Sequence, residues 1–190
     1  MKNTTKNTTI MIAVSAMYCA LLVGGKAALA VLPNVEVVTI LIAVCSYVWG
    51  FAVALPCVNV FIMIETSIWG INTWVISYLI HWNTVAICFC LIGKLKVKSN
   101  LTIVAFSTLC AAVLCTTYGL LTSLVDTLIG FSGGFFVDAS NFGYRFAAIY
   151  TAGFPFYVTQ IVTNVVLFIV GFLPLLKVNQ KAKLNLCTTN

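Results

Sequence analysis

The amino-acid sequence predicts an all-α membrane protein with six transmembrane helices and both termini in the cytoplasm. Three observations lead to this prediction. The chain of 190 residues is 62% hydrophobic and only 7% charged, whereas a soluble domain has about 25% charged residues. Its apolar residues form six runs that can each be read as a membrane helix. Eight of its nine lysines gather in three clusters outside those runs.

Taken in order, the runs account for nearly the whole chain, which we treat as one integral membrane domain, 1–190, with no room for a soluble catalytic domain. The first run follows a short basic start, but no polar domain follows it, so we do not read it as a removed signal peptide. The third run is short, which suggests a tilted or partly re-entrant path, and Pro56 is expected at its start. The expected spans are 10–24, 37–54, 56–69, 74–93, 101–125 and 156–176.

The lysine clusters set the expected topology. Cytoplasmic connections are enriched in Lys and Arg, so all three clusters are placed inside. Four spans precede the second cluster and two more precede the third, so the parity is consistent with this placement. The clusters are Lys2 and Lys6, then Lys94, Lys96 and Lys98, then Lys177, Lys181 and Lys183. These charges are expected to meet lipid headgroups, not nucleic acid.

Three connections are then expected to face outward: 25–36, 70–73 and 126–155. The first is apolar and ends in Pro33, Asn34 and Glu36. We expect it to act as a plug or lid over an outward cavity, with Asn34 and Glu36 near a ligand. The alternative is that Asn34 only caps the second helix, with Glu36 favouring its positive end. The third connection is long, which is typical of a functional segment.

A carboxylate and an aromatic stripe mark the third and fourth spans. Glu65 lies inside a span, where a carboxylate is costly and is a functional candidate. The alternative is a pair with Lys26, with Arg145 or with a backbone group. Trp74 and Tyr78, followed by either His81 or Trp82, give one helix face that suits a flat ligand, or alternatively an interfacial aromatic belt.

Polar residues spaced by four mark the outer halves of the last two spans. Tyr118 precedes Thr122 and Asp126, and Gln160 precedes Asn164. Either these groups line the same cavity as Glu65 and Tyr78, or they form hydrogen bonds between helices. Arg145, on the long outer connection, is expected to pair with an acidic ligand or with Glu65.

Other features narrow the functions that the chain can have. The first span carries Ala16 and Ala20, whose spacing allows another helix to approach closely. The intramembrane cysteines are read as small packing residues, so no metal site is expected. No phosphate-binding loop is present, so the chain needs a partner to use ATP.

These stretches together resemble the substrate-binding S components of bacterial energy-coupling factor (ECF) vitamin transporters. A departure is His81-Trp82-Asn83, where close relatives are expected to have proline after the tryptophan. The stretches are Leu29 to Glu36, Asn59 to Glu65, Gly70 to Trp82, Arg145-Phe146, Gly153 to Tyr157 and Gln160 to Asn164.

The resemblance implies a substrate-specific, multi-pass subunit in a bacterial cell membrane. Such a subunit is not an enzyme and binds no cofactor itself; it captures a vitamin or related small molecule from outside beneath the first outward connection. It then docks on a membrane coupling subunit with two ATPase subunits, through a motif that Ala16 and Ala20 match. The alternatives are a stand-alone secondary carrier or channel, and an intramembrane enzyme using Glu65, His81 or Asp126.

Overall fold

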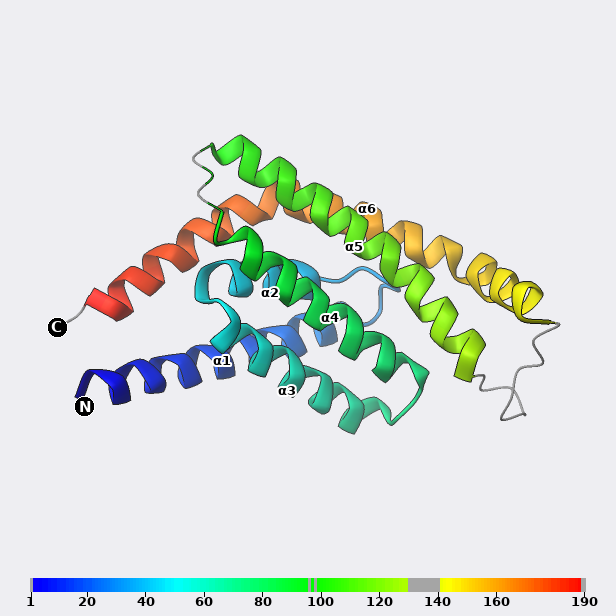
Figure 1. The fold of residues 1–190 in the computed structure, drawn as a ribbon, viewed down its shortest axis with the longest axis horizontal. Helices are drawn as coiled ribbons and strands as arrows, with labels where there is room; N and C mark the ends of the chain where they lie inside the picture. Colours follow the sequence, from blue (N-terminus) through cyan, green and yellow to red (C-terminus); the bar gives the residue numbers. More distant parts are fainter. Residues whose placement is uncertain (1, 96, 98, 130–140, 189–190) are drawn as a thin grey trace.

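The computed structural model describes residues 2–95, 97, 99–129 and 141–188. These residues form six α-helices and no strand (Figure 1). All except the second are long and apolar enough to cross a membrane. The predicted all-α class is therefore confirmed, and the five long apolar helices are compatible with a multi-pass membrane bundle. The helices are α1 (Lys2–Ala28), α2 (Val38–Trp49), α3 (Phe51–Trp69), α4 (Thr73–Ile92), α5 (Asn100–Ile129) and α6 (Phe142–Thr188).

The helices pack side by side, α1 against α2 and α3, α2 also against α4 and α6, and α5 against both α4 and α6. Both chain ends and the α4–α5 connection lie at one end of the molecule, on the left in Figure 1. We call this the terminal end. The α3–α4 connection, the last turn of α5 and the first turn of α6 lie at the opposite, distal end. The basic connection near Lys94 is thus on the same side as both termini, as the lysine parity requires.

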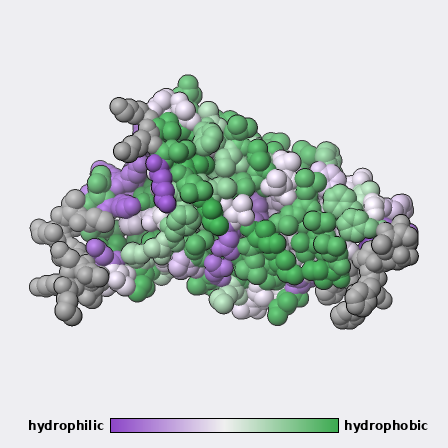
Figure 2. Space-filling view, viewed as in Figure 1, coloured by the Kyte–Doolittle hydropathy of each residue, from purple (hydrophilic) through white to green (hydrophobic). Residues whose placement is uncertain are grey.

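The core is built from aromatic and branched side chains. Phe61, Phe89, Phe168 and Phe172 are fully buried, and the rings of Phe168 and Phe172 stack with centroids 5.2 Å apart. Many large hydrophobic side chains are exposed as well, and Figure 2 shows hydrophobic residues over most of the middle of the face that it presents. A surface of this kind matches lipid hydrocarbon, where water cannot compete for the backbone and helices satisfy their own hydrogen bonds.

The second helix, not the third, is the short one. We expected spans at 37–54 and 56–69, but the break falls at Gly50, whose φ of 76° ends α2 and precedes α3. Glycine adopts this left-handed conformation without a steric cost. Helix α2 is therefore 12 residues, about 18 Å, long, and Pro56 lies inside α3 and not at its start.

The last two helices extend beyond their expected ends. Helix α6 has 47 residues instead of the expected 156–176, and it contains both Pro155 and Pro174. Figure 1 shows it bent, as expected for an apolar helix that accommodates prolines. Most described residues of the predicted outer connection 126–155 are therefore helical, in α5 or α6; residues 130–140 lie outside the described part of the chain.

Helix α1 is also longer than expected, because it continues to Ala28 and not to residue 24. Its last turn contains Lys26, which the sequence placed in the outward connection. Ala16 and Ala20 lie on the face of α1 that its neighbours leave exposed.

Candidate ligand-binding cavity

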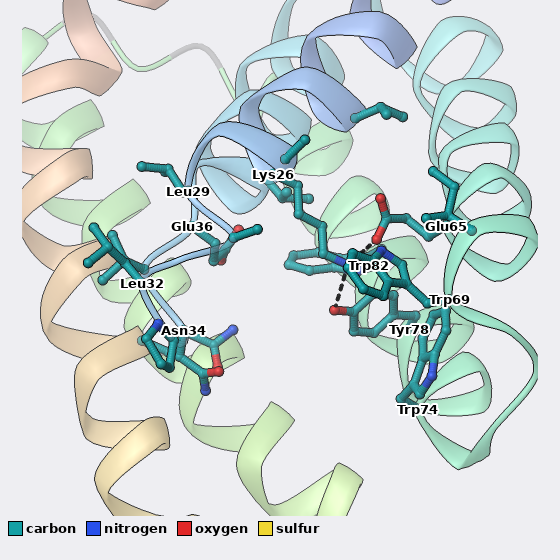
Figure 3. A pocket seen from close by; sticks show the side chains of 18 of the residues that line it. Lys26, Leu29, Leu32, Asn34, Glu36, Glu65, Trp69, Trp74, Tyr78 and Trp82 are labelled. Atoms are coloured by element: carbon teal, nitrogen blue, oxygen red, sulfur yellow. Dashed lines mark hydrogen bonds and ion pairs between the residues drawn. The ribbon is translucent and has the colours of Figure 1, made fainter.

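A cavity of about 580 Å³ is lined mainly by the α1–α2 connection, the last turns of α1 and α3 and the first half of α4. In Figure 1 these segments lie away from the terminal end. Its size lies in the range of small-molecule sites. Figure 3 shows one wall formed by the α1–α2 connection and the facing wall formed by α3 and α4. The lining residues are Val23, Lys26, Ala27, Leu29, Ala30, Leu32, Pro33, Asn34, Val35, Glu36, Val38, Glu65, Ile68, Trp69, Trp74, Tyr78, Trp82, Tyr118 and Gln160.

The α1–α2 connection covers the cavity with irregular backbone. Asn34 has a φ of 57°, a left-handed conformation in which Asn is enriched among non-glycine residues, and it interrupts the helical path. Its side-chain Nδ2 donates to the carbonyl of Phe156 on α6, at 3.0 Å. Asn34 also lines the cavity, a position that is compatible with the expected lid. The alternative that Asn34 caps α2 is wrong, because Val37 is the N-cap and makes no side-chain cap bond.

Glu36 instead supplies the carboxylate at the start of α2. It accepts hydrogen bonds from the backbone N–H of Thr39, at 3.0 Å, and from the Thr39 hydroxyl. It also accepts a bond from Nδ2 of Asn164, at 3.0 Å. The carboxylate thus satisfies a free amide of the first helical turn and holds α2 against α6.

On the facing wall, Lys26 reaches from α1 to Glu65 on α3 (Figure 3). The Lys26 ammonium forms an ion pair with Glu65 and donates to the Tyr78 hydroxyl, at 3.1 Å. It also lies over the ring of Tyr78, 4.7 Å from the centroid. Of the partners considered for Glu65, Lys26 is the one that the structure places beside it. A carboxylate that is 2% exposed is thereby neutralised inside the bundle.

The aromatic stripe of α4 faces the cavity through Trp74, Tyr78 and Trp82. Their rings follow one another with centroids 4.9 and 5.7 Å apart. Tyr118 of α5 approaches Tyr78 with a centroid separation of 6.3 Å. Of the two residues considered for the third position of this stripe, Trp82 lines the cavity and His81 does not. His81 is buried, with its ring centroid 4.6 Å from that of Tyr118.

Two buried amides close the α6 side. Gln160 lines the cavity, and its Oε1 has no hydrogen-bond partner among the described residues. Asn164 lies one turn further on, where its Nδ2 donates to Glu36 and to the Gln160 carbonyl. That pattern fixes the amide orientation of Asn164 and leaves its buried Oδ1 unpaired.

The structure therefore brings together most of the residues that the sequence nominated. Asn34, Glu36, Glu65, Trp74, Tyr78, Tyr118 and Gln160 line one cavity. Asn164 supports it from behind. Arg145 is outside the lining, on the first turns of α6. Asp126 is outside it as well and accepts a hydrogen bond from the Thr73 hydroxyl, which ties α5 to the start of α4.

Sequence reasoning missed Lys26 and Trp69 as lining residues. Lys26 was placed in a connection because the apolar run was ended at a pair of glycines, Gly24 and Gly25. A lysine two residues after that run, with intramembrane Glu65 as a candidate partner, was the available signal. Trp69, which is 65% exposed, stands at the rim, and its place at the end of an apolar run gave only the general signal of an interfacial tryptophan.

The described residues include no group of three or more His, Cys, Asp and Glu side chains placed to hold a metal ion. The three side chains considered for an enzyme also have separate surroundings: Glu65 pairs with Lys26, Asp126 bonds Thr73, and His81 packs against rings. The cavity thus presents aromatic faces, one ion pair, a carboxylate that caps the first turn of α2, and one amide oxygen, that of Gln160, without a partner among the described residues. No protein family, no curated protein and no solved structure matches the chain.

Proposed function

We propose that this chain is the substrate-binding S component of an ECF-type transporter in a bacterial cell membrane. In this proposal it captures a vitamin-like small molecule from outside, and a separate coupling subunit with two ATPases drives the import. The observation that supports the proposal is the cavity, which lies among helix ends away from the terminal end and has the α1–α2 connection as one wall. The resemblance of the sequence supplies the transporter class.

The α1–α2 connection suits the part of a lid. Residues 29–37 form turns and bends between two helices, so they can move without unwinding either. Two contacts anchor the segment, Asn34 to the Phe156 carbonyl and Glu36 to Asn164. Irregular backbone at membrane depth is tolerated where it lines a cavity, which is where this segment lies.

The exposed face of α1 suits docking to the coupling subunit. Ala16 and Ala20 are exposed, and a Cβ added at Gly24, four residues further, would meet nothing within 4 Å. Small side chains at this spacing allow the backbone of another helix to approach closely. Binding and docking would then use different surfaces of α1, the Lys26 side for the cavity and the alanine side for the partner.

A stand-alone secondary carrier is the second candidate, and the ion pair of Lys26 with Glu65 is the observation that favours it. Paired ionisable residues inside a membrane often belong to ion or proton pathways. The two candidates differ in their energy source, which can be measured directly.

The test is uptake by proteoliposomes of the small molecule that is extracted from the purified protein. We expect the chain alone to bind this molecule without accumulating it, and accumulation to require the coupling subunit, both ATPases and ATP. A catalytically dead ATPase is the matched control. Uptake by the chain alone under a proton gradient would favour the carrier and contradict the proposal.

A further inference from the structure

Three charged side chains line the cavity among the described residues: Lys26, Glu36 and Glu65. Their formal charges sum to −1, because the lining contains one ammonium and two carboxylates. Lys26 belongs to the protein itself and already neutralises Glu65. The cavity therefore has an excess of negative charge in an environment where water is partly excluded, and this excess favours a cationic guest.

The aromatic side chains are arranged to hold a cation. The Lys26 ammonium lies 4.7 Å from the ring centroid of Tyr78, 5.8 Å from that of Phe61 and 5.9 Å from that of Trp74. These separations are within the range at which a ring face attracts a positive charge. Trp82 and Tyr118 extend the same aromatic lining.

The unsatisfied polar groups on the α6 side are acceptors. Gln160 is 3% exposed, lines the cavity and has an unpaired Oε1. Behind it, Asn164 is fully buried with an unpaired Oδ1, and its amide orientation is fixed by its two donated bonds. Of these two residues only Gln160 lines the cavity. A buried acceptor without a partner is costly, so its Oε1 favours a guest that brings an N–H donor.

From these three observations we propose that the cavity binds a small organic cation that carries a flat ring and N–H donors. Its positive group takes the position that the Lys26 ammonium holds, beside Glu65 and over Tyr78, and its donors face Gln160. Lys26 leaves this position when the guest arrives. Its side chain is 27% exposed and comes from the last turn of α1, so its long stem can turn toward the rim.

This inference rests on the proposed function, since it names the class of substrate for the same cavity. It also predicts an effect of removing Lys26 that an acidic guest would reverse. If the lysine competes with a cationic guest, its removal strengthens binding. If the lysine instead holds an acidic guest, its removal abolishes binding. The same substitution therefore separates the two substrate classes.

The test uses three probes of similar shape and different charge: phenethylamine as the cation, phenylacetate as the anion and 2-phenylethanol as the neutral compound. Binding to the purified full chain in detergent is followed by tryptophan fluorescence, because Trp69, Trp74 and Trp82 line the cavity. We expect phenethylamine to bind about tenfold more tightly than either other probe. Lys26→Met should bind it more tightly than the parent does, and Glu65→Gln about tenfold more weakly.

A preference for phenylacetate, or loss of all binding in a folded Lys26→Met, would overturn the inference and leave the cavity as a site for an acidic molecule. Saturable binding of none of the three probes would also overturn it. If Lys26→Met does not fold, the relative affinities of the parent protein for the three probes still decide whether the cavity prefers a cation. Mass analysis of the molecule that co-purifies decides the proposed function separately: a neutral or acidic molecule there refutes the cation and not the transporter.

Discussion

At the scale of single residues, the ion pair of Lys26 and Glu65 joins a buried carboxylate to a partly exposed ammonium inside the described bundle. Glu65 is almost fully buried, while the side chain of Lys26 is 27% exposed. The two partners therefore depend on each other unequally. Without Lys26 the carboxylate keeps its burial and loses its counter-charge, whereas without Glu65 the ammonium can still reach the rim along its flexible stem.

We therefore predict that Lys26→Met destabilises the protein more than Glu65→Gln does. Removing one partner of a buried pair costs on the order of 3 kcal/mol, and a partly exposed ammonium left alone costs about 1 kcal/mol. Thermal unfolding in detergent measures both, with Lys181→Met on an exposed part of α6 as the control. The double variant should lose less than the sum of the two. Equal losses in the single variants would contradict the asymmetry.

Chemically distinctive residues were predictable one by one. Three patterns are visible in the sequence: a carboxylate inside a span, an aromatic residue at every fourth position and a pair of amides spaced by four. Each predicted a residue that lines the cavity, namely Glu65, Tyr78 and Gln160. Arg145 does not, because its expected position assumed an open connection where the chain is helical. The sequence left three possible partners for Glu65, namely Lys26, Arg145 and a backbone group. It could not decide among them, because the spacing of residues along one helix does not give the distance to a residue on another helix.

At the scale of elements, the α5–α6 contact depends on close approach around Tyr157. Its hydroxyl forms a hydrogen bond with Ser123 at 3.0 Å, and its ring lies against Gly119. A Cβ added at Gly119 would be 2.8 Å from Cγ of that ring. Cγ of Tyr157 is held close to the backbone, so it cannot move away from the added Cβ as the end of a flexible side chain can.

Gly119→Ala is therefore expected to destabilise the protein by about 1–3 kcal/mol through overpacking. Gly143→Ala is the matched control, because a Cβ there meets nothing within 4 Å and alanine favours a helix. Unfolding midpoints of the two variants should move in opposite directions. A neutral result for Gly119→Ala would show that α5 and α6 separate at little cost.

The exposed face of α1 leads to a prediction about transport. Ala16→Trp or Ala20→Trp should block close approach of a partner helix and reduce uptake at least about tenfold, with ligand binding to the isolated chain near normal. Leu109→Trp, on an exposed part of α5, is the control and should leave uptake intact. Equal loss of binding and uptake in the alanine variants would mean that this face serves packing within the chain.

Helix boundaries were less predictable than helix existence. Apolar runs identified every helix, but the break at Gly50 depends on a single left-handed glycine inside a continuous apolar stretch, and Pro56 six residues later was the more visible signal. Similarly, Pro155 lies inside α6 and does not mark its start. Asn83, at the position expected to be proline, exchanges hydrogen bonds with Asn59 of α3, at 3.1 and 3.3 Å. That contact is a feature of packing that no sequence pattern predicted.

At the scale of the whole molecule, both chain ends and the basic α4–α5 connection lie together at the terminal end. The lysine rule predicts that this end is cytoplasmic and that the cavity lies on the outward side. In a variant without native cysteines, cysteine at Ser99 or Lys181 should react only with reagents that reach the cytoplasmic side. Cysteine at Ile71, which is 85% exposed at the distal end, should react from outside. Labelling of positions 71 and 99 from one side would contradict this topology.

The central claim is that this cavity holds a small molecule, and mass analysis of what the purified protein carries tests it most directly. The parent chain, extracted from cells grown in rich medium, should release one small molecule in near-stoichiometric amount. Tyr78→Ala and Gln160→Ala should lose it while remaining folded, since a buried hydrogen-bond partner is worth roughly ten- to hundred-fold in affinity. Leu109→Ala, on the exposed surface of α5, should retain it. A folded parent that releases nothing, or the same molecule retained by both cavity variants, would contradict the account.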